Sequence, residues 1–350
     1  MSAQSRRWPH GRGPMAMGGH VKLLVTGGAG YIGSVVATVL LEGGHEVTVL
    51  DDLSTGHRDA VPAGARFSQA TIRDGAAGTL PGVDAVLHFA AKSLVGESVA
   101  HPSLYWQHNL GGTLALLEAM RVAGVRRIVF SSTAAVYGDP ERTPTEETSP
   151  TLPTSPYGAS KLAVDTALAE YARLHGIGAV SLRYFNVAGA YRGRDGAWFG
   201  ERHDRETHLI PNVLAAAARQ GRGGKHRQLQ IFGDDYPTPD GTAIRDFIHV
   251  TDLVGAHLSA LDACDPGRHL VYNLGNGTGS SVRAVVEMCR QVTGVDIAAQ
   301  AAPRRPGDPA VLVASAARIR AELGWRATRD LRAMVEDAWA FMTSAPAARR

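Results

Sequence analysis

A glycine-rich turn between an apolar strand and a helix is the feature that most constrains how this chain folds. The strand is expected at 21–27 (VKLLVTG), the helix at 33–44 (GSVVATVLLEGG), and the turn TGGAGYIG occupies 26–33. The G-x-x-G-x-x-G spacing permits a tight turn, close approach of a pyrophosphate to the backbone, and close packing of the helix on the strand. The N-terminus of the helix adds free N–H groups and positive potential for phosphates. The turn therefore predicts a dinucleotide-binding site.

An acidic residue at the end of the next expected strand supports this prediction. The segment HEVTVLDD (45–52) reads as a strand, and Asp51 lies at its end, 18 residues after Gly33. A carboxylate there can accept hydrogen bonds from the adenosine ribose hydroxyls. It also repels a 2′-phosphate, so the pattern favours NAD over NADP. A solvated acid at a strand end is the alternative interpretation of Asp51.

Strands and helices alternate along the first half of the chain. Further strands are expected at 65–69, 84–89, 126–131 and 178–183, and helices at 109–123 and 158–175. Such alternation implies right-handed βαβ crossovers and a parallel sheet with helices on both faces. The predicted fold class is a Rossmann-type, doubly wound α/β sheet. In sheets of this kind, ligands bind at the carboxyl ends of the strands.

The alternation breaks after about residue 186. Residues 189–206 and 219–243 are polar or rich in Gly, Pro and Arg, and we interpret both as loops around a helix at 209–219. Two strand candidates, IRDFIHV and HLVYNLG, follow within 243–276. Helices expected at 281–292, 315–323 and 331–343 complete a smaller C-terminal α/β substrate-binding lobe.

The expected domain organisation has three parts. Residues 1–20 are interpreted as a disordered leader, with Met15 or Met17 as a possible true start. Residues 21–186 form an NAD-binding Rossmann domain, with a return to it at 243–276. Residues 187–345 contribute mainly the substrate-binding lobe.

Composition and charge exclude several other classes of function. The net charge is +3, and no basic stripe with interleaved aromatic residues lies between the basic termini, so nucleic-acid binding is not expected. No apolar run approaches the ~18 residues needed to span a membrane. The two cysteines, Cys264 and Cys289, form neither a disulfide framework nor a metal motif. We therefore expect a cytoplasmic protein with no metal site.

A hydroxyl-rich strand end and a helix that begins shortly after it supply candidate catalytic groups. The strand ends in Ser131-Ser132-Thr133, and Tyr157 and Lys161 lie at positions i and i+4 on one face of the later helix. A phenol with its ordinary pKa near 10 is a poor base at pH 7. A nearby ammonium and an oxidised nicotinamide would lower that pKa, so the phenolate could take a proton from a sugar hydroxyl. The Thr133 hydroxyl could bind the same oxygen. An ordinary amphipathic helix with a solvated lysine is the alternative.

These motifs, taken together and in order, resemble the extended short-chain dehydrogenase/reductase family, and within it the UDP-hexose 4-epimerases. The similarity runs from about Val21 to Trp325. The segments that carry it are TGGAGYIGS (26–34), LDDLSTGH (50–57), HFAAKSLVGES (88–98), SSTAAVYG (131–138), SPYGASK (155–161), LRYFNVAGA (182–190), IFGDDYPTPDGTAIRDFIHVTDL (231–253) and RRPGD (304–308).

The resemblance implies a function and a catalytic site. Tyr157 would be the catalytic base, Lys161 would tune it and bind the nicotinamide ribose, and Thr133 would be the hydroxyl partner. The expected enzyme is an isomerase that interconverts UDP-galactose and UDP-glucose through a 4-keto sugar, with NAD tightly bound and not consumed. The expected cofactor contacts are Gly27, Gly30, Tyr31, Ile32, Gly33, Asp51, Phe89, Ala90, Ala91, Asn109, Ser131, Tyr157, Lys161 and Tyr184.

The resemblance also implies how the UDP-sugar is held. Asn186 would contact the UDP moiety, while Arg245 and Arg305 would bind the diphosphate, a task that planar guanidinium groups suit. Asp308 would bind the uridine ribose. Residues 187–345 would then be mainly a sugar-nucleotide-binding lobe.

Four further residues belong to the nucleotide site by the same resemblance. His208 and Leu209 lie in a stretch that lines this site in relatives, and Ile231 and Phe232 would flank the uracil. A helix-capping or surface histidine is the alternative for His208, and a plain core residue is the alternative for Phe232. A homodimer formed through the helices at 109–123 and 158–175 is also expected.

The sequence does not identify which UDP-sugar the enzyme prefers. Relatives vary between a bulky tyrosine and small residues where this chain has Leu312, so epimerisation of UDP-GlcNAc and UDP-GalNAc is an alternative, as are UDP-pentoses and UDP-uronates. In sugar-nucleotide dehydratases an acidic residue that assists loss of water comes directly after the active-site threonine, whereas Ala134 and Ala135 follow Thr133 here. A net dehydrogenase would need exchangeable NAD. A regulatory protein that keeps the dinucleotide fold without catalysis would be free to lose Tyr157 or Lys161, and this chain has both.

Overall fold

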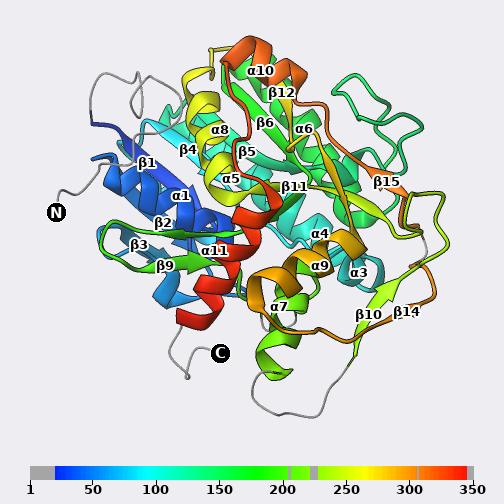
Figure 1. The fold of residues 1–350 in the computed structure, drawn as a ribbon. Helices are drawn as coiled ribbons and strands as arrows, with labels where there is room; N and C mark the ends of the chain where they lie inside the picture. The colour runs from blue at the N-terminus through cyan, green and yellow to red at the C-terminus, as the bar shows by residue number, and fades with distance from the viewer. Residues whose placement is uncertain (1–19, 204–205, 221–227, 306, 345–350) are drawn as a thin grey trace.

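A seven-stranded parallel sheet forms the centre of the computed structural model, which describes residues 20–203, 206–220, 228–305 and 307–344 (Figure 1). The strand order is β12-β6-β5-β4-β1-β2-β3, and every neighbouring pair is parallel. The strands are β1 (Lys22–Thr26), β2 (Glu46–Asp51), β3 (Arg66–Gln69), β4 (Ala85–His88), β5 (Arg127–Thr133), β6 (Gly178–Tyr184) and β12 (His269–Leu274). The predicted doubly wound α/β fold is confirmed. The winding reverses between β1 and β4, which is where such sheets bind dinucleotides.

Helices cover both faces of this sheet because the side chains of each strand alternate between two cores. In β1, Leu23 and Val25 belong to one core and Leu24 to the other. The helices on the Leu24 side are α2 (Ile72–Thr79), α5 (Gly112–Ala123) and α6 (Pro156–His175), and those on the opposite side are α1 (Tyr31–Glu42), α8 (Val250–Asp262) and α10 (Ala317–Leu323). Two short helices, α3 (Val95–Ala100) and α4 (Pro102–Tyr105), and a π-helical stretch at Trp106–Gly111 precede α5.

The remaining elements gather around a third core. It is built from side chains of α7 (Leu209–Gln220), α9 (Val282–Thr293) and α11 (Leu331–Ser344). A small mixed sheet places β11 (Ile244–His249) beside β7 (Asn186–Ala188), β13 (Gly279–Ser281) and β15 (Val311–Leu312). Two strand pairs complete the fold, β8 (Ala190–Arg192) with β9 (Trp198–Gly200) and β10 (Leu229–Phe232) with β14 (Ala299–Ala302). In Figure 1, β10 and β14 lie side by side at the lower right, well away from the central sheet.

The structure differs from the sequence-based expectation in several places. Residues 189–206 are not only loop, because β8 and β9 pair there as an antiparallel hairpin. The hairpin is stabilised by Phe199, which is buried against the core on the α1 side of the sheet. Of the two strands expected at 243–276, β12 joins the central sheet, whereas β11 lies in the smaller one.

The expected leader at 1–20 lies outside the described residues except for His20. None of the helices within the described residues is long and apolar enough to cross a membrane. Cys264 and Cys289 are both buried and unpaired.

Candidate active site

The glycine turn joins β1 to α1 at the carboxyl edge of the sheet. A Cβ atom on Gly33 would lie 2.2 Å from the Gly27 carbonyl oxygen, and a Cβ on Gly27 would lie 2.5 Å from the backbone nitrogen of Ala90. Gly27 also has a φ of 72°, which disfavours other residues. By contrast, the only neighbour near a Cβ on Gly30 among the described atoms would be the Gly27 carbonyl oxygen, at 3.4 Å. The backbone is therefore tightly packed at Gly27 and Gly33, whereas Gly30 has space beside it.

The open end of this turn suits an anion. Gly30 is the N-cap of α1 and gives no side-chain hydrogen bond to the first turn, which also lacks acidic residues. The first N–H groups of α1 are thus available to an outside acceptor, and the helix dipole adds positive potential there. Tyr31 and Ile32 are the first two residues of this helix.

Asp51, at the end of β2, is held by one backbone N–H of the glycine turn and by another of the segment that follows β2. Its Oδ2 accepts a hydrogen bond from the Ala29 N–H at 3.0 Å, and its Oδ1 accepts one from the Leu53 N–H at 2.8 Å. Burial raises the pKa of Asp51, although the two backbone hydrogen bonds lower it in part. Each carboxylate oxygen keeps a second lone pair, so the group can still accept from ribose hydroxyls. The glycine turn, the free N-terminus of α1 and this oriented carboxylate together fit NAD.

The segment after β4 borders the same turn. Phe89 N–H donates to the Thr26 carbonyl at 3.0 Å, and Ala90 N–H lies 3.5 Å from Thr26 Oγ1. Asn109, which was expected to contact the cofactor, uses its amide to hold this segment: its Oδ1 accepts from the Lys92 N–H at 2.8 Å, and its Nδ2 donates to the Lys92 carbonyl at 3.0 Å. Asn109 therefore positions the backbone beside the dinucleotide turn.

The helix that carries the candidate base begins where its sequence indicates. Ser155 caps α6 by accepting a hydrogen bond from the Gly158 N–H at 3.2 Å, and Pro156 occupies the first helical position. A Cβ on Gly158 would lie 2.4 Å from the Ala135 carbonyl oxygen. The absence of that Cβ lets the start of α6 pack closely against the turn that follows Thr133.

This packing brings Tyr157, Thr133 and Lys161 together at the carboxyl end of β5. Thr133 hydrogen-bonds the hydroxyl of Tyr157, and the Lys161 Nζ donates to the Ser131 carbonyl at 2.7 Å. Lys161 Nζ also lies 4.6 Å from the centre of the Phe130 ring. The three proposed catalytic groups therefore lie on two adjacent elements, β5 and α6.

The pKa of Tyr157 differs from the sequence-based expectation. Burial raises this pKa, and the hydrogen bond with Thr133 offsets only part of the rise. Burial also lowers the pKa of Lys161 to about 7, although the carboxylate of Asp165 raises it. The expected lowering of the phenol pKa is thus not produced by the residues of the chain alone, because desolvation outweighs the polar contacts.

Tyr184, at the end of β6, adjoins this group. It hydrogen-bonds Ser131, and its hydroxyl lies 2.5 Å from His257 Nε2. Burial lowers the pKa of His257 to about 4, so the ring is neutral. Its Nδ1–H donates to the Leu253 carbonyl at 2.9 Å, which leaves Nε2 as an acceptor for the Tyr184 hydroxyl.

The residues expected to bind the UDP-sugar fall into two groups. In the first, Arg245 on β11 forms an ion pair with Asp308 and pairs in strand register with Leu312 on β15. Asn186 on β7 pairs with Phe247, two residues along the same strand from Arg245. Asn186, Arg245 and Leu312 therefore lie on one small sheet.

The second group lies on β10. The guanidinium of Arg305 lies over the Phe232 ring at 4.1 Å from its centre, and Phe232 is 37% exposed whereas its neighbour Ile231 is buried. Tyr236, four residues after Phe232, donates its hydroxyl to the Asp308 carbonyl of the first group at 3.4 Å.

His208 lies elsewhere. It stands immediately before Leu209, the first residue of α7, and its Nδ1 lies 2.6 Å from a carboxylate oxygen of Glu201. The contacts of its ring are thus with the carboxylate-rich segment after β9, and its expected role at the nucleotide site stays a prediction.

Several residues that shape the site were not foreseen. Ser160, between Tyr157 and Lys161 in the chain, accepts a hydrogen bond from Asn109 Nδ2 at 3.0 Å and donates to the Tyr157 carbonyl at 2.8 Å. The Tyr105 ring meets the Tyr157 ring edge-on at 6.2 Å. A serine inside the quoted SPYGASK segment was the only sequence signal for these contacts.

The chain is similar over most of its length to proteins of known family. Residues 23–275 match the model of the NAD dependent epimerase/dehydratase family. A UDP-glucose 4-epimerase of Streptomyces lividans is 56% identical over 331 residues, which cover 93% of this chain and 97% of that one. A UDP-glucose 4-epimerase of Corynebacterium glutamicum is 55% identical over 327 residues, which cover 93% and 96%. The crystal structure of a UDP-glucose 4-epimerase from Stenotrophomonas maltophila with bound NAD and formylated UDP-arabinopyranose superposes with a TM-score of 0.86 at 40% identity, covering 93% of this chain and 98% of that one.

Proposed function

The chain belongs to the NAD dependent epimerase/dehydratase family, and on this basis we propose that it interconverts UDP-galactose and UDP-glucose by inverting carbon 4 of the sugar. The observation that carries the proposal is the meeting of Tyr157, Thr133 and Lys161 at the same carboxyl edge of the parallel sheet as the dinucleotide turn. An epimerase needs a base for one hydroxyl and a retained hydride carrier, and these residues supply the first next to a site that fits the second.

NAD is the cofactor, and when bound it supplies the hydride acceptor for carbon 4 and the donor that returns the hydride to the opposite face. The open glycine turn and the N-terminus of α1 would bind its pyrophosphate, and Asp51 would bind its adenosine ribose. Lys161, fixed on the Ser131 carbonyl, would bind the nicotinamide ribose.

Tyr157 acts as the base and then as the acid of the reaction. Its phenolate oxygen takes the proton of the sugar 4-hydroxyl as the alcohol carbon is oxidised to a ketone, and it returns that proton when the ketone is reduced. Thr133, hydrogen-bonded to Tyr157, would bind the same substrate oxygen and keep it in line with the base. The positive charge of Lys161 would stabilise the phenolate before it takes this proton and again after it returns it, while Tyr157 keeps the proton as a neutral phenol when the sugar turns.

Inversion requires an anchored nucleotide and a hexose that can turn between the two transfers. Arg245 would release Asp308 to bind the diphosphate, which leaves the Asp308 carboxylate for the uridine ribose. Ile231 and Phe232 on β10 would flank the uracil, and Arg305, which lies over the Phe232 ring, would bind the diphosphate together with Arg245. Asn186, on the same small sheet as Arg245, would contact the UDP moiety.

The local structure after Thr133 argues against dehydration. Ala134 and Ala135 form a short 3-10 turn in which Thr133 Oγ1 accepts from the Ala135 N–H at 3.1 Å. Neither side chain can donate a proton to a leaving hydroxyl, whereas a dehydratase needs such an acid. The alternative that stays open is a 4-epimerase for UDP-GlcNAc and UDP-GalNAc, a UDP-pentose or a UDP-uronate, because Leu312 is intermediate in size.

We further propose a cytoplasmic homodimer. Three large apolar side chains on or just before α5 are exposed, Trp106 (40%), Leu114 (38%) and Val122 (74%). Their burial against a second copy would stabilise a dimer formed through α5 and α6. Static light scattering during size-exclusion chromatography tests the dimer, and a mass of one chain would contradict it.

Proton NMR of the purified protein with UDP-galactose and no added NAD tests the proposed activity. Appearance of UDP-glucose would support epimerisation with retained cofactor. No conversion, even after NAD is supplied, would contradict the proposal, and UDP-GalNAc, UDP-pentoses and UDP-uronates would then be tested.

A further inference from the structure

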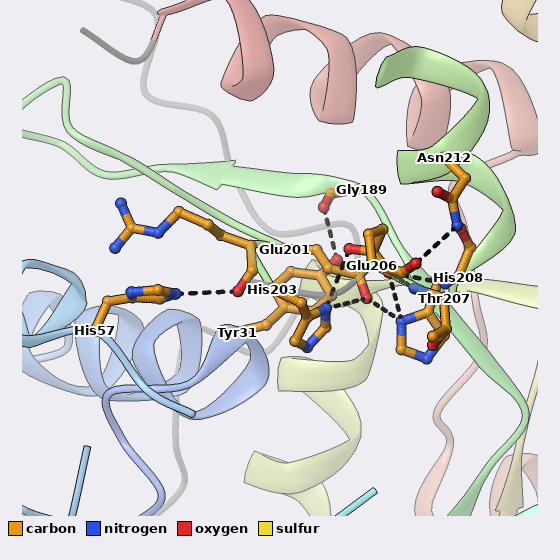
Figure 2. Close-up of polar contacts among 10 residues, drawn as sticks. Tyr31, His57, Gly189, Glu201, His203, Glu206, Thr207, His208 and Asn212 are labelled. Atoms are coloured by element: carbon orange, nitrogen blue, oxygen red, sulfur yellow. Dashed lines mark hydrogen bonds and ion pairs between the residues drawn. The ribbon is translucent and has the colours of Figure 1, made fainter. Parts of the chain in front are cut away.

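Four potential metal ligands converge between β9 and α7. They are Glu201, His203, Glu206 and His208, and one ligand atom of each lies within 4.8 Å of the other three (Figure 2). All four side chains are half-buried. Figure 2 shows both imidazoles turned toward the carboxylates. We call this group the Glu/His cluster.

The spacing of the Glu/His cluster is close to that of a tetrahedral metal site. His208 Nδ1 lies 2.6 Å from Glu201 Oε1 and 3.3 Å from Glu206 Oε1. His203 Nδ1 lies 3.6 Å from Glu201 Oε1 and 3.1 Å from Glu206 Oε2. Zinc bonds of about 2.0–2.1 Å in a tetrahedron place neighbouring ligand atoms about 3.3–3.4 Å apart. The four distances, 2.6–3.6 Å, lie on either side of this spacing, so the ligand atoms are already grouped as closely as such an ion requires of these pairs.

We propose that the Glu/His cluster binds one divalent transition-metal ion, with zinc the best match, as a structural site. Imidazole nitrogens favour zinc and its neighbours over magnesium or calcium, which prefer sites built from oxygen. Four protein ligands fill a tetrahedral zinc ion and leave no position for water, as is typical of structural and not catalytic zinc.

A buried nitrogen in the cluster supports this inference. Among the described residues, Nδ1 of His208 is shielded from solvent and has no hydrogen-bond partner of acceptable geometry, although two carboxylates lie close by. A pure ion-pair network would align an N–H with one of these oxygens. A metal ion would satisfy that nitrogen and both carboxylates together.

One carboxylate of the cluster is already oriented by the backbone. Glu206 Oε1 accepts hydrogen bonds from the N–H groups of Thr207 and His208, both at 2.8 Å. Asn212 Nδ2 donates to the Glu206 carbonyl at 3.3 Å and to the His208 carbonyl at 2.9 Å. Such outer contacts fix metal ligands in place and raise affinity.

The position of the cluster suggests what the ion would do. Next to Glu201, Arg202 forms an ion pair with Asp59, and its carbonyl lies 3.2 Å from His57 Nε2. Glu201 also acts electrostatically on Tyr31, the first residue of the helix that starts at the dinucleotide turn. The ion would therefore cross-link the start of α7 to the cofactor-binding half of the molecule. No step of the proposed reaction uses it.

The sequence alone predicted no metal site. The pattern Glu-x-His-x-x-Glu-x-His (201–208) begins in the segment 189–206 interpreted as loop and ends just before the helix expected at 209–219, and its spacing is not one of the common zinc motifs. Only the hairpin of β8 and β9, followed by the start of α7, brings the four side chains together.

The test is metal content of the NAD-bound protein. Four proteins are compared: wild type, His203→Ala, Glu206→Gln and the control His101→Ala, which replaces an exposed histidine between α3 and α4. Each is incubated with zinc chloride and freed of unbound metal by gel filtration. Its zinc content is then measured by inductively coupled plasma mass spectrometry. We expect wild type and the control to retain one zinc per chain, and the two cluster variants to lose at least about tenfold in zinc affinity. Zinc should raise the Tm of wild type and of the control but not that of the variants.

Two results would overturn the proposal. One is a wild type that retains no zinc, and the other is equal retention by wild type and His203→Ala. If the variants do not fold, wild type loaded with cobalt decides the question through its visible absorption. Intense bands of a tetrahedral ion support the site, whereas weak six-coordinate bands or no bound cobalt contradict it.

Discussion

The Nζ atom of Lys161 donates a 2.7 Å hydrogen bond to the backbone carbonyl of Ser131, and this contact fixes a buried ammonium of α6 against the end of β5. Thr133, the partner of Tyr157, lies two residues further along the same strand. The lysine and the tyrosine are thus positioned by one strand end. The arrangement costs stability, because burial lowers the pKa of Lys161 to about 7 despite the nearby Asp165.

Stability should depend on pH through this lysine. A lysine in an unfolded chain titrates near 10.4. From about pH 7 to pH 10, the unfolded chain therefore binds a proton that the native protein does not, and stability rises with pH. In Lys161→Met this contribution is absent. Relative to the variant, wild type should gain about 2–4 kcal/mol across this window, measured by urea unfolding of NAD-free protein. If the stabilities of wild type and Lys161→Met change in parallel with pH, Lys161 keeps an ordinary pKa in the native protein.

Removal of the Thr133 hydroxyl should move the pH profile of catalysis. The hydrogen bond with Thr133 lowers the pKa of Tyr157, so Thr133→Val should raise it. Because the base acts as a phenolate, the ascending limb of kcat against pH should shift to higher pH, and kcat at pH 7 should fall about 10- to 100-fold. Thr133→Ser keeps the donor and is the matched control. An unshifted limb in Thr133→Val would exclude Thr133 from tuning the base.

The parts of the structure that the sequence could predict are those set by local pattern. The apolar run of β1, the glycine turn and the Pro156 start of α6 each specify their own backbone, and the sheet follows from their order. The hairpin of β8 and β9 was missed because Phe199 is stabilised by contacts with distant helices, which no local pattern reveals.

The sequence allowed candidate site residues to be named, but it did not give their pKa values or hydrogen-bond partners. Tyr157 and Lys161 were identified by spacing, but their pKa values depend on burial, which requires the fold. The hydrogen bonds of the Asn109 amide to the backbone of Lys92 were not expected, and its place at the cofactor stays a prediction. The role of a polar side chain depends on which partner lies nearest, and sequence spacing does not give that distance.

Asp51→Asn should weaken retention of NAD. An amide cannot accept with both of its terminal atoms, so one of the two backbone N–H groups that Asp51 binds, those of Ala29 and Leu53, would lose its acceptor. We expect NAD affinity to fall about 10- to 100-fold through this loss and the loss of a charged ribose partner. Absorbance of the released nucleotide after gel filtration measures it. Asp52→Asn, which alters the acceptor of Ser54 N–H, is the control, and equal occupancy in both variants would argue against Asp51.

Gly33→Ala should damage the dinucleotide turn. The new Cβ would lie 2.2 Å from the Gly27 carbonyl oxygen, so the backbone must shift at a cost of at least about 1–3 kcal/mol. Gly78→Ala is the matched control, because a Cβ there meets no described atom within 4 Å and alanine favours a helix by up to about 1 kcal/mol. Urea unfolding should show the first variant destabilised and the second unchanged or more stable. A Gly33→Ala variant as stable as wild type, with NAD retained, would mean that the turn is looser than its geometry indicates.

Leu312→Tyr should separate the two classes of hexose substrate. Leu312 pairs in register with Arg245, the proposed diphosphate anchor, so added bulk there would approach the sugar end of the bound nucleotide. We expect kcat/KM for UDP-GalNAc to fall about 10- to 100-fold, while that for UDP-galactose stays within about threefold, since an N-acetyl group needs the space that a tyrosine ring fills. Leu312→Ala is the opposite control and should favour the N-acetyl sugar. NMR progress curves with both substrates give the ratio directly. Equal losses on both substrates would show that Leu312 supports the fold of β15 and does not select the sugar.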